Sequence, residues 1–329
     1  MLEHGGNLAS AAAQHGIPLA YWLDISTGIN PNGYPIPEIP PLLWQRLPLA
    51  DDGLHEAALA YYDTRHLLAT AGSQAAIQAL PKLRSACQVA MPDMMYAEHA
   101  RNWTVNSHQV TRYSGTPSET LLNAADVLVV CNPNNPTGGM IAPATLLAWH
   151  AKLAKRGGWL VIDEAFMDCT PEFSLAPYAH LPGLIILRSL GKFFGLAGAR
   201  VGFVLAPPSL LDQLEDTLGP WPIAGPARFI ARHALQNSQW QRATRSNLNT
   251  NSQRLHSLLS QHGLVPEASH ALYQWVPTRN GEAWHQYFAR QGIWVRLFQE
   301  WSALRFGLPP DAGWERLEAA LKNSNVQDA

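Results

Sequence analysis

The sequence predicts an α/β protein with a large domain, in which helices cover a mostly parallel sheet, and a small α+β domain. Three observations support this fold class. Between about residues 67 and 206, short uninterrupted apolar runs alternate with helical stretches, as in strands that are buried on both faces. After about residue 226, a longer stretch of helical character precedes short strands. The segment 24–41 is rich in Pro, Gly and Asn, which predicts an irregular arm.

The elements follow from these patterns in chain order. In the large domain we expect strands over 67–70, 87–91, 127–130, 159–162, 184–187 and 201–204. In the small domain we expect helical structure over 227–259, strands near 272–276 and 293–298, and a last amphipathic helix with apolar residues at 314, 317 and 321. The predicted organisation is an N-terminal arm over 1–40, a large domain over 41–225 and a small domain over 226–329.

Composition limits the partners and the compartment. The chain has 329 residues, of which 47% are hydrophobic and 15% charged, and its 23 Lys and Arg nearly balance 25 Asp and Glu. No global field exists to bind nucleic acid or an anionic membrane. The first residues lack a signal-peptide pattern, no apolar run is long enough to span a bilayer, and three cysteines form no CxxC pair. We therefore expect a cytoplasmic protein with neither of these partners.

Several common site motifs are missing. Gly191-Lys192 is followed by Phe193, which excludes a Walker A loop, and no GxGxxG sequence opens a helix after a strand. The 13 histidines form no HExxH motif and no His/Cys cluster in the sequence. The sequence therefore predicts no metal site.

Polar residues instead follow the ends of the predicted strands, where open α/β sheets bind their ligands. Small residues at Gly72, Ser73 and Gln74 could bring backbone N–H groups to an anion, although a serine N-cap without a ligand is the plain alternative. In the loop 131–138, two Asn-Pro steps hold Asn135 at a rigid strand end, although a mere turn is the alternative. Asp163 ends a buried strand and needs a cationic partner.

The last of these loops, 188–200, contains a lysine among apolar and glycine residues. Lys192 is a candidate Schiff-base lysine, because desolvation makes its amine nucleophilic toward a carbonyl, whereas an isolated lysine would more often be a solvated surface residue. Together, the loops that follow these strands offer a site for an anion, a carboxylate for a pyridinium nitrogen, an amide for a phenolic oxygen and an amine for an aldehyde. Pyridoxal 5′-phosphate (PLP) carries all four of the groups that such a site would bind. The predicted cofactor-binding residues are Gly72, Ser73, Gln74, Tyr96, Asn135, Asp163, Ser189, Lys192 and Arg200.

These motifs resemble, in order and spacing, those of the fold type I, aspartate-aminotransferase-like PLP enzymes. The resemblance rests on residues 132–138, on 163–166 and on Ser189-x-x-Lys192-x-x-Gly195 continuing to Arg200, and it covers nearly the whole chain. It implies that Tyr96 stacks on the cofactor ring, although a core tyrosine is the plain alternative. The implied catalytic residues are Lys192, Asp163 and Tyr96. The resemblance also implies a homodimer.

Within this family the chain looks most like the threonine-phosphate decarboxylases of cobalamin biosynthesis, whose sister group is the histidinol-phosphate aminotransferases. The segment His4-Gly5-Gly6-Asn7 and the segment 24–33 resemble pieces that frame the substrate in the decarboxylases. The implied reaction converts O-phospho-L-threonine to 1-amino-2-propanol phosphate. A histidinol-phosphate-type aminotransferase is the alternative, and a non-catalytic PLP-binding protein is a third hypothesis.

Substrate binding is expected from arginines near the C-terminal end. Arg296 and Arg305 each lie on a short apolar strand, where a guanidinium needs an anion. The resemblance implies that Arg305 binds the substrate α-carboxylate and Arg296 its phosphate, although an internal salt bridge is the alternative. His4, Gly5, Asn30 and Asn135 complete the predicted substrate-binding set. In family members, a tyrosine at this position often contacts the cofactor phosphate of the neighbouring subunit. This chain has Leu47 there.

Overall fold

The chain forms two compact units in a computed structural model that describes residues 5–324 and 326. The larger unit comprises Gly33–Asn135 and Met140–Gln241. The smaller unit comprises Met1–Asn32, Pro136–Gly139 and Arg242–Ala329. The unit boundaries fall near 33 and 241, whereas the sequence places them near 40 and 225, and those domain limits stay a prediction.

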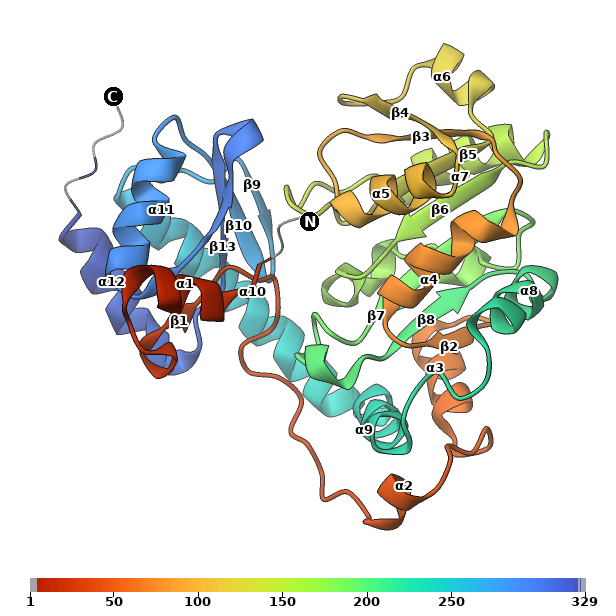
Figure 1. The fold of residues 1–329 in the computed structure, drawn as a ribbon, viewed down its shortest axis with the longest axis horizontal. Coiled ribbons are helices and arrows are strands. Elements are labelled where there is room, and N and C mark those ends of the chain that lie inside the picture. Colours follow the sequence, from red (N-terminus) through yellow and green to blue (C-terminus); the bar gives the residue numbers. More distant parts are fainter. Residues whose placement is uncertain (1–4, 325, 327–329) are drawn as a thin grey trace. The chain divides into compact units, whose positions relative to one another are not determined.

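A mixed, mostly parallel sheet forms the centre of the larger unit (Figure 1). In the described part of the chain it has seven strands in the order β2-β8-β7-β6-β5-β3-β4. The pairs from β7 through β6, β5 and β3 to β4 are parallel, while β8 is antiparallel to both β2 and β7. The strands are β2 Leu68–Thr70, β3 Gln88–Pro92, β4 Gln109–Tyr113, β5 Val127–Cys131, β6 Trp159–Asp163, β7 Leu184–Ser189 and β8 Gly202–Leu205.

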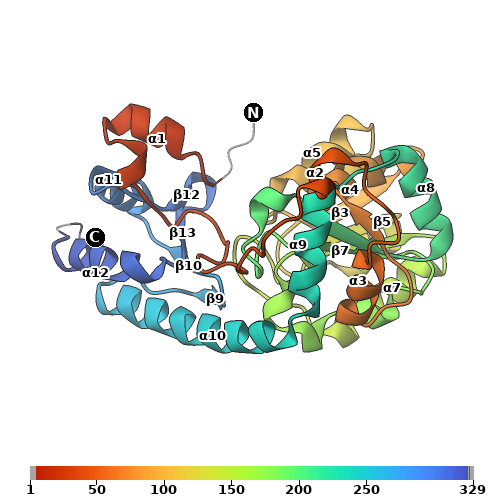
Figure 2. The same ribbon diagram turned by 90° about the horizontal axis from the view of Figure 1, so that it is seen from below.

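The central strands are hydrophobic because helices cover both faces of the sheet. Every residue of β5, β7 and β8 is buried. Figures 1 and 2 show α4 and α5 on one face and α7 on the other. The helices of this unit are α2 Leu42–Gln45, α3 Leu54–Tyr62, α4 Ser73–Ala79, α5 Ala97–Val105, α6 Glu119–Ala124, α7 Pro143–Ala154, α8 Pro208–Leu218 and α9 Gly225–Gln236. Helix α10, Ser238–Gln261, begins in the larger unit and ends in the smaller one.

The smaller unit is built around an antiparallel sheet with the strand order β12-β13-β10-β9. Its strands are β9 Ala268–His270, β10 Tyr273–Pro277, β12 Arg296–Phe298 and β13 Ala303–Gly307. A parallel pair joins β1, Leu23–Asp24, to β11, Ile293–Trp294. The remaining helices are α1 Leu8–His15, α11 Gly281–Arg290 and α12 Trp314–Lys322. The α+β character expected for this part of the chain is therefore present.

All six predicted strands of the large domain exist, but three details differ from the expectation. Strand β4 was not predicted, because its residues are partly or fully exposed and form no apolar run. The helical text over 227–259 is two helices, because the side chain of Asn237 accepts a hydrogen bond from the backbone N–H of Trp240 (3.0 Å) and caps α10. The run 293–298 is split because β11 pairs with β1 and β12 pairs with β13.

None of the helices within the described residues combines the length and the apolar character that crossing a membrane requires.

Candidate active site

A pocket lies at the carboxyl ends of the parallel strands of the larger unit. It has an empty volume of about 620 Å³. Eight of the nine residues that the sequence analysis assigns to cofactor binding line it, and Gly72 is the exception. The lining residues are Ser73, Gln74, Tyr96, Cys131, Pro133, Asn135, Asp163, Ala165, Phe166, Ser189, Lys192 and Arg200. Residues 127 positions apart in the chain thus converge on one place, as expected for the ligand edge of an open α/β sheet.

Asp163 is a buried carboxylate at the end of β6, and it is only 5% exposed. Its Oδ1 accepts a hydrogen bond from the backbone N–H of Ala165 (3.0 Å). Its Oδ2 lies 2.9 Å from Nε2 of His99, which is 1% exposed. The sequence predicted a cationic partner for Asp163 but did not point to His99. Tyr96 is the N-cap of α5 and His99 lies in its first turn, and the contact of His99 with Asp163 depends on how α5 packs on the sheet.

Cys131 is buried like Asp163 and His99 and lies close to both. The ligand atoms of His99, Cys131 and Asp163 all lie within 4.8 Å of one another, a combination that could hold a metal ion. Burial, and after it the charge of Asp163, raise the pKa of the Cys131 thiol well above its ordinary value. Since metals bind the thiolate, coordination here would first have to remove that proton. The prediction of no metal stays a prediction.

Two glycines open a cradle for an anion beside α4. Gly72 has φ +72°, and a Cβ atom there would meet Nη2 of Arg200 at 2.7 Å. A Cβ atom on Gly202 would meet the backbone N of Ser73 at 2.5 Å. Because neither glycine has a side chain, the guanidinium of Arg200 and the backbone N–H of Ser73 can approach the same space. Arg200 itself has φ +53°, which is a strained conformation for a non-glycine residue. Ser189 lies at the end of β7 and also lines the pocket.

Lys192 follows β7 in the loop that leads to β8. Its Nζ lies 5.5 Å from the centre of the Phe166 ring, a distance typical of a cation–π contact. Phe166 and the neighbouring Phe193 are buried, while Asp163, Asn135 and Ser189 line the same pocket as Lys192. The role of Lys192 as a nucleophilic amine stays a prediction.

Tyr96 is oriented by its hydroxyl group. The hydroxyl donates to Oε1 of Gln74 (3.3 Å), and Nε2 of Gln74 donates to Glu98 (3.3 Å). Burial, followed by the charges of Glu98 and Asp163, raises the pKa of Tyr96 to about 12. Tyr96 is therefore a neutral aromatic group at neutral pH.

The Asn-Pro loop presents Asn135 to the pocket. The side chain of Asn132 is buried and pairs with the backbone of Ile141 through two hydrogen bonds, of 2.7 Å and 3.1 Å. Nδ2 of Asn134 donates to the carbonyl of Met94 (3.0 Å). The rigidity that the sequence analysis attributes to the prolines thus comes also from two asparagine side chains.

The predicted substrate arginines lie in the smaller unit, opposite each other on paired strands β12 and β13. Arg305 is only 6% exposed and donates to the carbonyl of Ser26 (2.8 Å). Burial, together with the like charge of Arg296, lowers the pKa of Arg305 to about 10, while Tyr273 opposes the shift. Two adjacent guanidinium groups of like charge make this a favourable place for an anion.

The other predicted substrate residues lie in different places. Asn30 is buried in the smaller unit, and its Oδ1 accepts from the backbone N–H of Asn32 (3.0 Å). Gly5 packs so closely that a Cβ atom would meet the carbonyl oxygen of Ser26 at 2.7 Å. His4 lies outside the described residues. Asn135 belongs to the pocket of the larger unit.

Comparison with known families agrees with this geometry. The profile of the family described as aminotransferase class I and II matches residues 50–329. The chain belongs to this family. The resemblance stated from the motifs is therefore confirmed.

Two threonine-phosphate decarboxylases match nearly the whole chain. The threonine-phosphate decarboxylase of Pseudomonas aeruginosa is 52% identical over 98% of this chain and 97% of its own length. The threonine-phosphate decarboxylase of a Sinorhizobium species is 38% identical over 96% of each chain. A histidinol-phosphate aminotransferase of Pectobacterium atrosepticum is 36% identical, but over only 46% of this chain and 43% of its own length.

A solved structure supports the fold. The histidinol-phosphate aminotransferase of Sinorhizobium meliloti, in complex with pyridoxal-5′-phosphate, has a TM-score of 0.81 at 21% identity and covers 97% of this chain and 94% of that one. The expected fold type I architecture is therefore confirmed.

Proposed function

We propose that this chain is a PLP-dependent carboxy-lyase that converts O-phospho-L-threonine to 1-amino-2-propanol phosphate. One observation carries the proposal: a relative named threonine-phosphate decarboxylase shares 52% of its residues with this chain over nearly the full length of both proteins. The family match and the pocket described above support it.

The residues of the pocket fit PLP. The space left open by Gly72 and Gly202 brings Arg200 and the N–H of Ser73 toward one point, which suits a phosphate. Ser189 completes that anion site, Asn135 would hold the phenolic oxygen, and Tyr96 would cover a ring face. When bound, PLP supplies an aldehyde that condenses with amines and a ring that withdraws electrons from a breaking bond at the substrate Cα.

Asp163 and Lys192 perform the proton chemistry. Asp163 would hold the ring nitrogen of bound PLP in its protonated form, because a nearby carboxylate stabilises that cation. His99 touches the other carboxylate oxygen at 2.9 Å and fixes its orientation. When the substrate carboxylate leaves as carbon dioxide, Lys192 Nζ delivers the proton that takes its place at Cα.

Arg305 and Arg296 of the smaller unit would determine which bond to the substrate Cα breaks. Arg305 binds the substrate α-carboxylate and Arg296 binds its phosphate, with Asn30, Gly5 and His4 assisting. Holding the carboxylate and the phosphate on separate guanidinium groups would restrict rotation about the bonds to Cα, and that rotation decides which bond breaks. The like charges on paired positions of β12 and β13 support this assignment.

A histidinol-phosphate-type aminotransferase is the second candidate, because the same lysine can move a proton from Cα instead. In sequence, the histidinol-phosphate aminotransferase of Pectobacterium atrosepticum matches only 46% of this chain, and this favours the decarboxylase.

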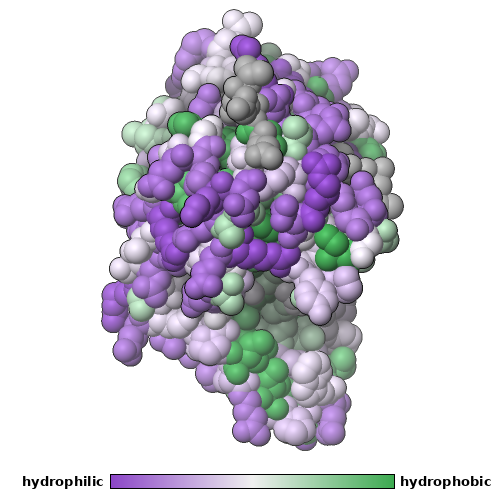
Figure 3. Space-filling view, turned by 90° about the vertical axis from the view of Figure 1, so that its left-hand side faces the viewer, coloured by the Kyte–Doolittle hydropathy of each residue, from purple (hydrophilic) through white to green (hydrophobic). Residues whose placement is uncertain are grey.

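We further propose a cytoplasmic homodimer that feeds the aminopropanol branch of cobalamin biosynthesis. Cys87, Cys131 and Cys169 are free thiols, in keeping with a reducing compartment. A set of exposed apolar side chains, here called the apolar arm, supports self-association: Ile36, Leu42, Trp44, Leu47 and Leu49. Figure 3 shows hydrophobic residues together at the lower end of the face drawn, at the height at which Figure 1 draws α2 and α9.

The proposal is tested by offering the purified, PLP-loaded protein two substrates. With O-phospho-L-threonine we expect carbon dioxide and an amino-alcohol phosphate. With histidinol phosphate and 2-oxoglutarate we expect no glutamate. The Lys192→Ala variant should be inactive in both assays, and glutamate without carbon dioxide would overturn the decarboxylase assignment.

A further inference from the structure

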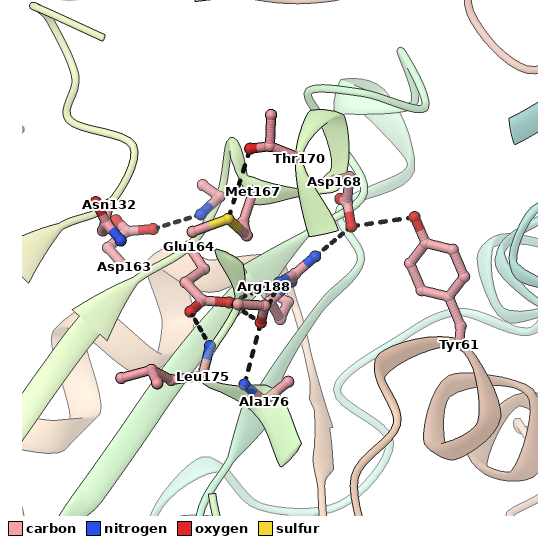
Figure 4. A network of polar contacts seen from close by, with 12 residues as sticks. Tyr61, Asn132, Asp163, Glu164, Met167, Asp168, Thr170, Leu175, Ala176 and Arg188 are labelled. Atoms are coloured by element: carbon pink, nitrogen blue, oxygen red, sulfur yellow. Dashed lines mark hydrogen bonds and ion pairs between the residues drawn. The ribbon is translucent and has the colours of Figure 1, made fainter. Parts of the chain in front are cut away.

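A fully buried charge cluster lies beside the pocket and takes no part in the chemistry described so far (Figure 4). Arg188 is 1% exposed, and Glu164 and Asp168 are 0% exposed. Nη1 of Arg188 donates to Glu164 (2.6 Å), and Nη2 donates to Asp168. One guanidinium thus bridges two carboxylates, which is the geometry that its planar fork allows and a lysine ammonium does not.

Further groups fix each member of the cluster. The backbone N–H of Leu175 donates to Glu164 (2.9 Å), and the hydroxyl of Tyr61 donates to Asp168 (3.2 Å). The guanidinium of Arg188 lies 4.5 Å from the centre of the Tyr62 ring. Burial alone would lower the pKa of Arg188, but Asp168 and Glu164 raise it above its ordinary value, so the cation persists at every physiological pH.

The cluster and the pocket share the same two strand ends. Glu164 directly follows Asp163 after β6, and Arg188 directly precedes Ser189 on β7. Successive side chains of a strand point to opposite faces, and Figure 4 shows Asp163 apart from the contacts around Arg188. The backbone N–H of Glu164 donates to the carbonyl of Leu187 (2.9 Å), which extends the β6–β7 ladder into the cluster.

We propose that Arg188 and Glu164 are positioning residues for the cofactor pocket, an inference that rests on the proposed function. Their ion pair clamps the end of β7 to the end of β6. This ion pair sets the distance between Asp163, at the end of β6, and the residues Ser189 and Lys192, at and after the end of β7. The pocket therefore keeps its dimensions when no ligand holds it open, and the carboxylate, the anion site and the amine stand where one rigid ring can reach all three.

The test compares Arg188→Lys with wild type and with a matched control. Lysine keeps the charge but cannot bridge both carboxylates. Asp52→Asn is the control, because it breaks another two-bond ion pair of the larger unit, with Arg228 (2.6 and 2.8 Å), away from β6 and β7. The readouts are the PLP dissociation constant, the pH midpoint of the visible absorption band of the PLP-bound protein, and the melting temperature of the PLP-free protein.

We expect Arg188→Lys to raise the PLP dissociation constant about tenfold or more and to shift the pH midpoint of the band. Asp52→Asn should change neither, although both variants melt at a lower temperature. If Arg188→Lys binds PLP as tightly as wild type, with the same midpoint and only a lower melting temperature, the cluster is merely structural and the inference is wrong.

A second variant decides the question if Arg188→Lys does not fold. Glu164→Gln leaves the ion pair of Arg188 with Asp168 in place, and the same shifts in affinity and midpoint are expected from it. Unchanged values for Glu164→Gln overturn the inference. Wild-type protein that takes up no PLP would overturn the proposed function and the inference with it, whereas tight wild-type binding matched by the variants overturns the inference alone.

Discussion

At the scale of single residues, burial keeps two groups of the pocket uncharged at neutral pH. It raises the pKa of the Cys131 thiol well above its ordinary value and the pKa of Tyr96 to about 12. Both side chains line the pocket together with Asp163, whose Oδ2 lies 2.9 Å from Nε2 of His99. Neither of them adds a second negative charge beside that carboxyl group.

The Asp163→Asn variant should lose most of its activity. Asparagine has nearly the same shape but no charge to hold the ring proton, and we expect kcat to fall by about 10²-fold or more. Decarboxylation of O-phospho-L-threonine at saturating PLP measures the loss. PLP content is determined in the same samples, and a variant with full PLP content and wild-type kcat would contradict the role of Asp163.

Tyr96 should make stability depend on alkaline pH. In the unfolded chain its hydroxyl loses its proton near the ordinary pKa of 10, whereas the folded protein keeps the proton up to about pH 12. The contribution of the buried neutral phenol is therefore complete below pH 10 and declines as the pH rises from 10 to 12. Urea unfolding of wild type and Tyr96→Phe at pH 8, 9.5 and 11 measures it, because phenylalanine lacks this term. Wild type should lose stability relative to the variant at pH 11, and a constant difference would show that the pKa is not raised.

At the scale of elements, the close approach of β8 to the start of α4 builds the anion cradle. Gly202 lets the backbone of Gly72 and Ser73 lie directly against β8, within distances that no Cβ atom tolerates. The contact joins a strand pair to the helix that begins at Ser73. The position of the Ser73 N–H is therefore fixed by packing of backbone on backbone.

Gly202→Ala should damage both stability and PLP binding. The added methyl group would lie 2.5 Å from the N of Ser73, and only backbone movement can relieve that contact. Overpacking of this kind costs about 1–3 kcal/mol of unfolding free energy, and the PLP dissociation constant should rise. Gly198→Ala is the matched control, because no atom lies within 4 Å of its Cβ position. Equal behaviour of the two variants would refute the argument.

The elements also show what the sequence could predict. The buried strands were predictable because a run such as Val127 to Val130 is apolar at every position. Strand β4 was not, because an edge strand needs no apolar face and Gln109 and Arg112 are exposed on it. Motif order predicted Asp163 and Lys192, but His99 reaches Asp163 only through the packing of α5, which no local pattern reports.

At the scale of the whole molecule, the apolar arm is unusual for a surface. Trp44 is 68% exposed, and Ile36, Leu47 and Leu49 are each more than 60% exposed within 14 residues of the chain. Leaving these side chains in water costs free energy that a partner surface would recover. The proposed homodimer gives them such a surface.

Trp44→Glu should therefore weaken the dimer. A carboxylate buried in an apolar interface without a partner is costly, and we expect wild type to sediment as a dimer at micromolar concentration and the variant to shift toward monomer. Val105→Glu is the control, since Val105 is 67% exposed outside the apolar arm. A monomeric wild type, or a variant that stays fully dimeric, would refute the prediction.

The smaller unit consists of three separate stretches of chain, one of which is the four-residue piece Pro136–Gly139. Asn135, which lines the pocket, is joined to that piece by a single peptide bond. No continuous fragment of the gene therefore encodes either unit. A C-terminal cassette taken from a relative would therefore place a smaller unit made of two proteins in one chain, with residues 5–32 and 136–139 from one and residues 242–324 from the other.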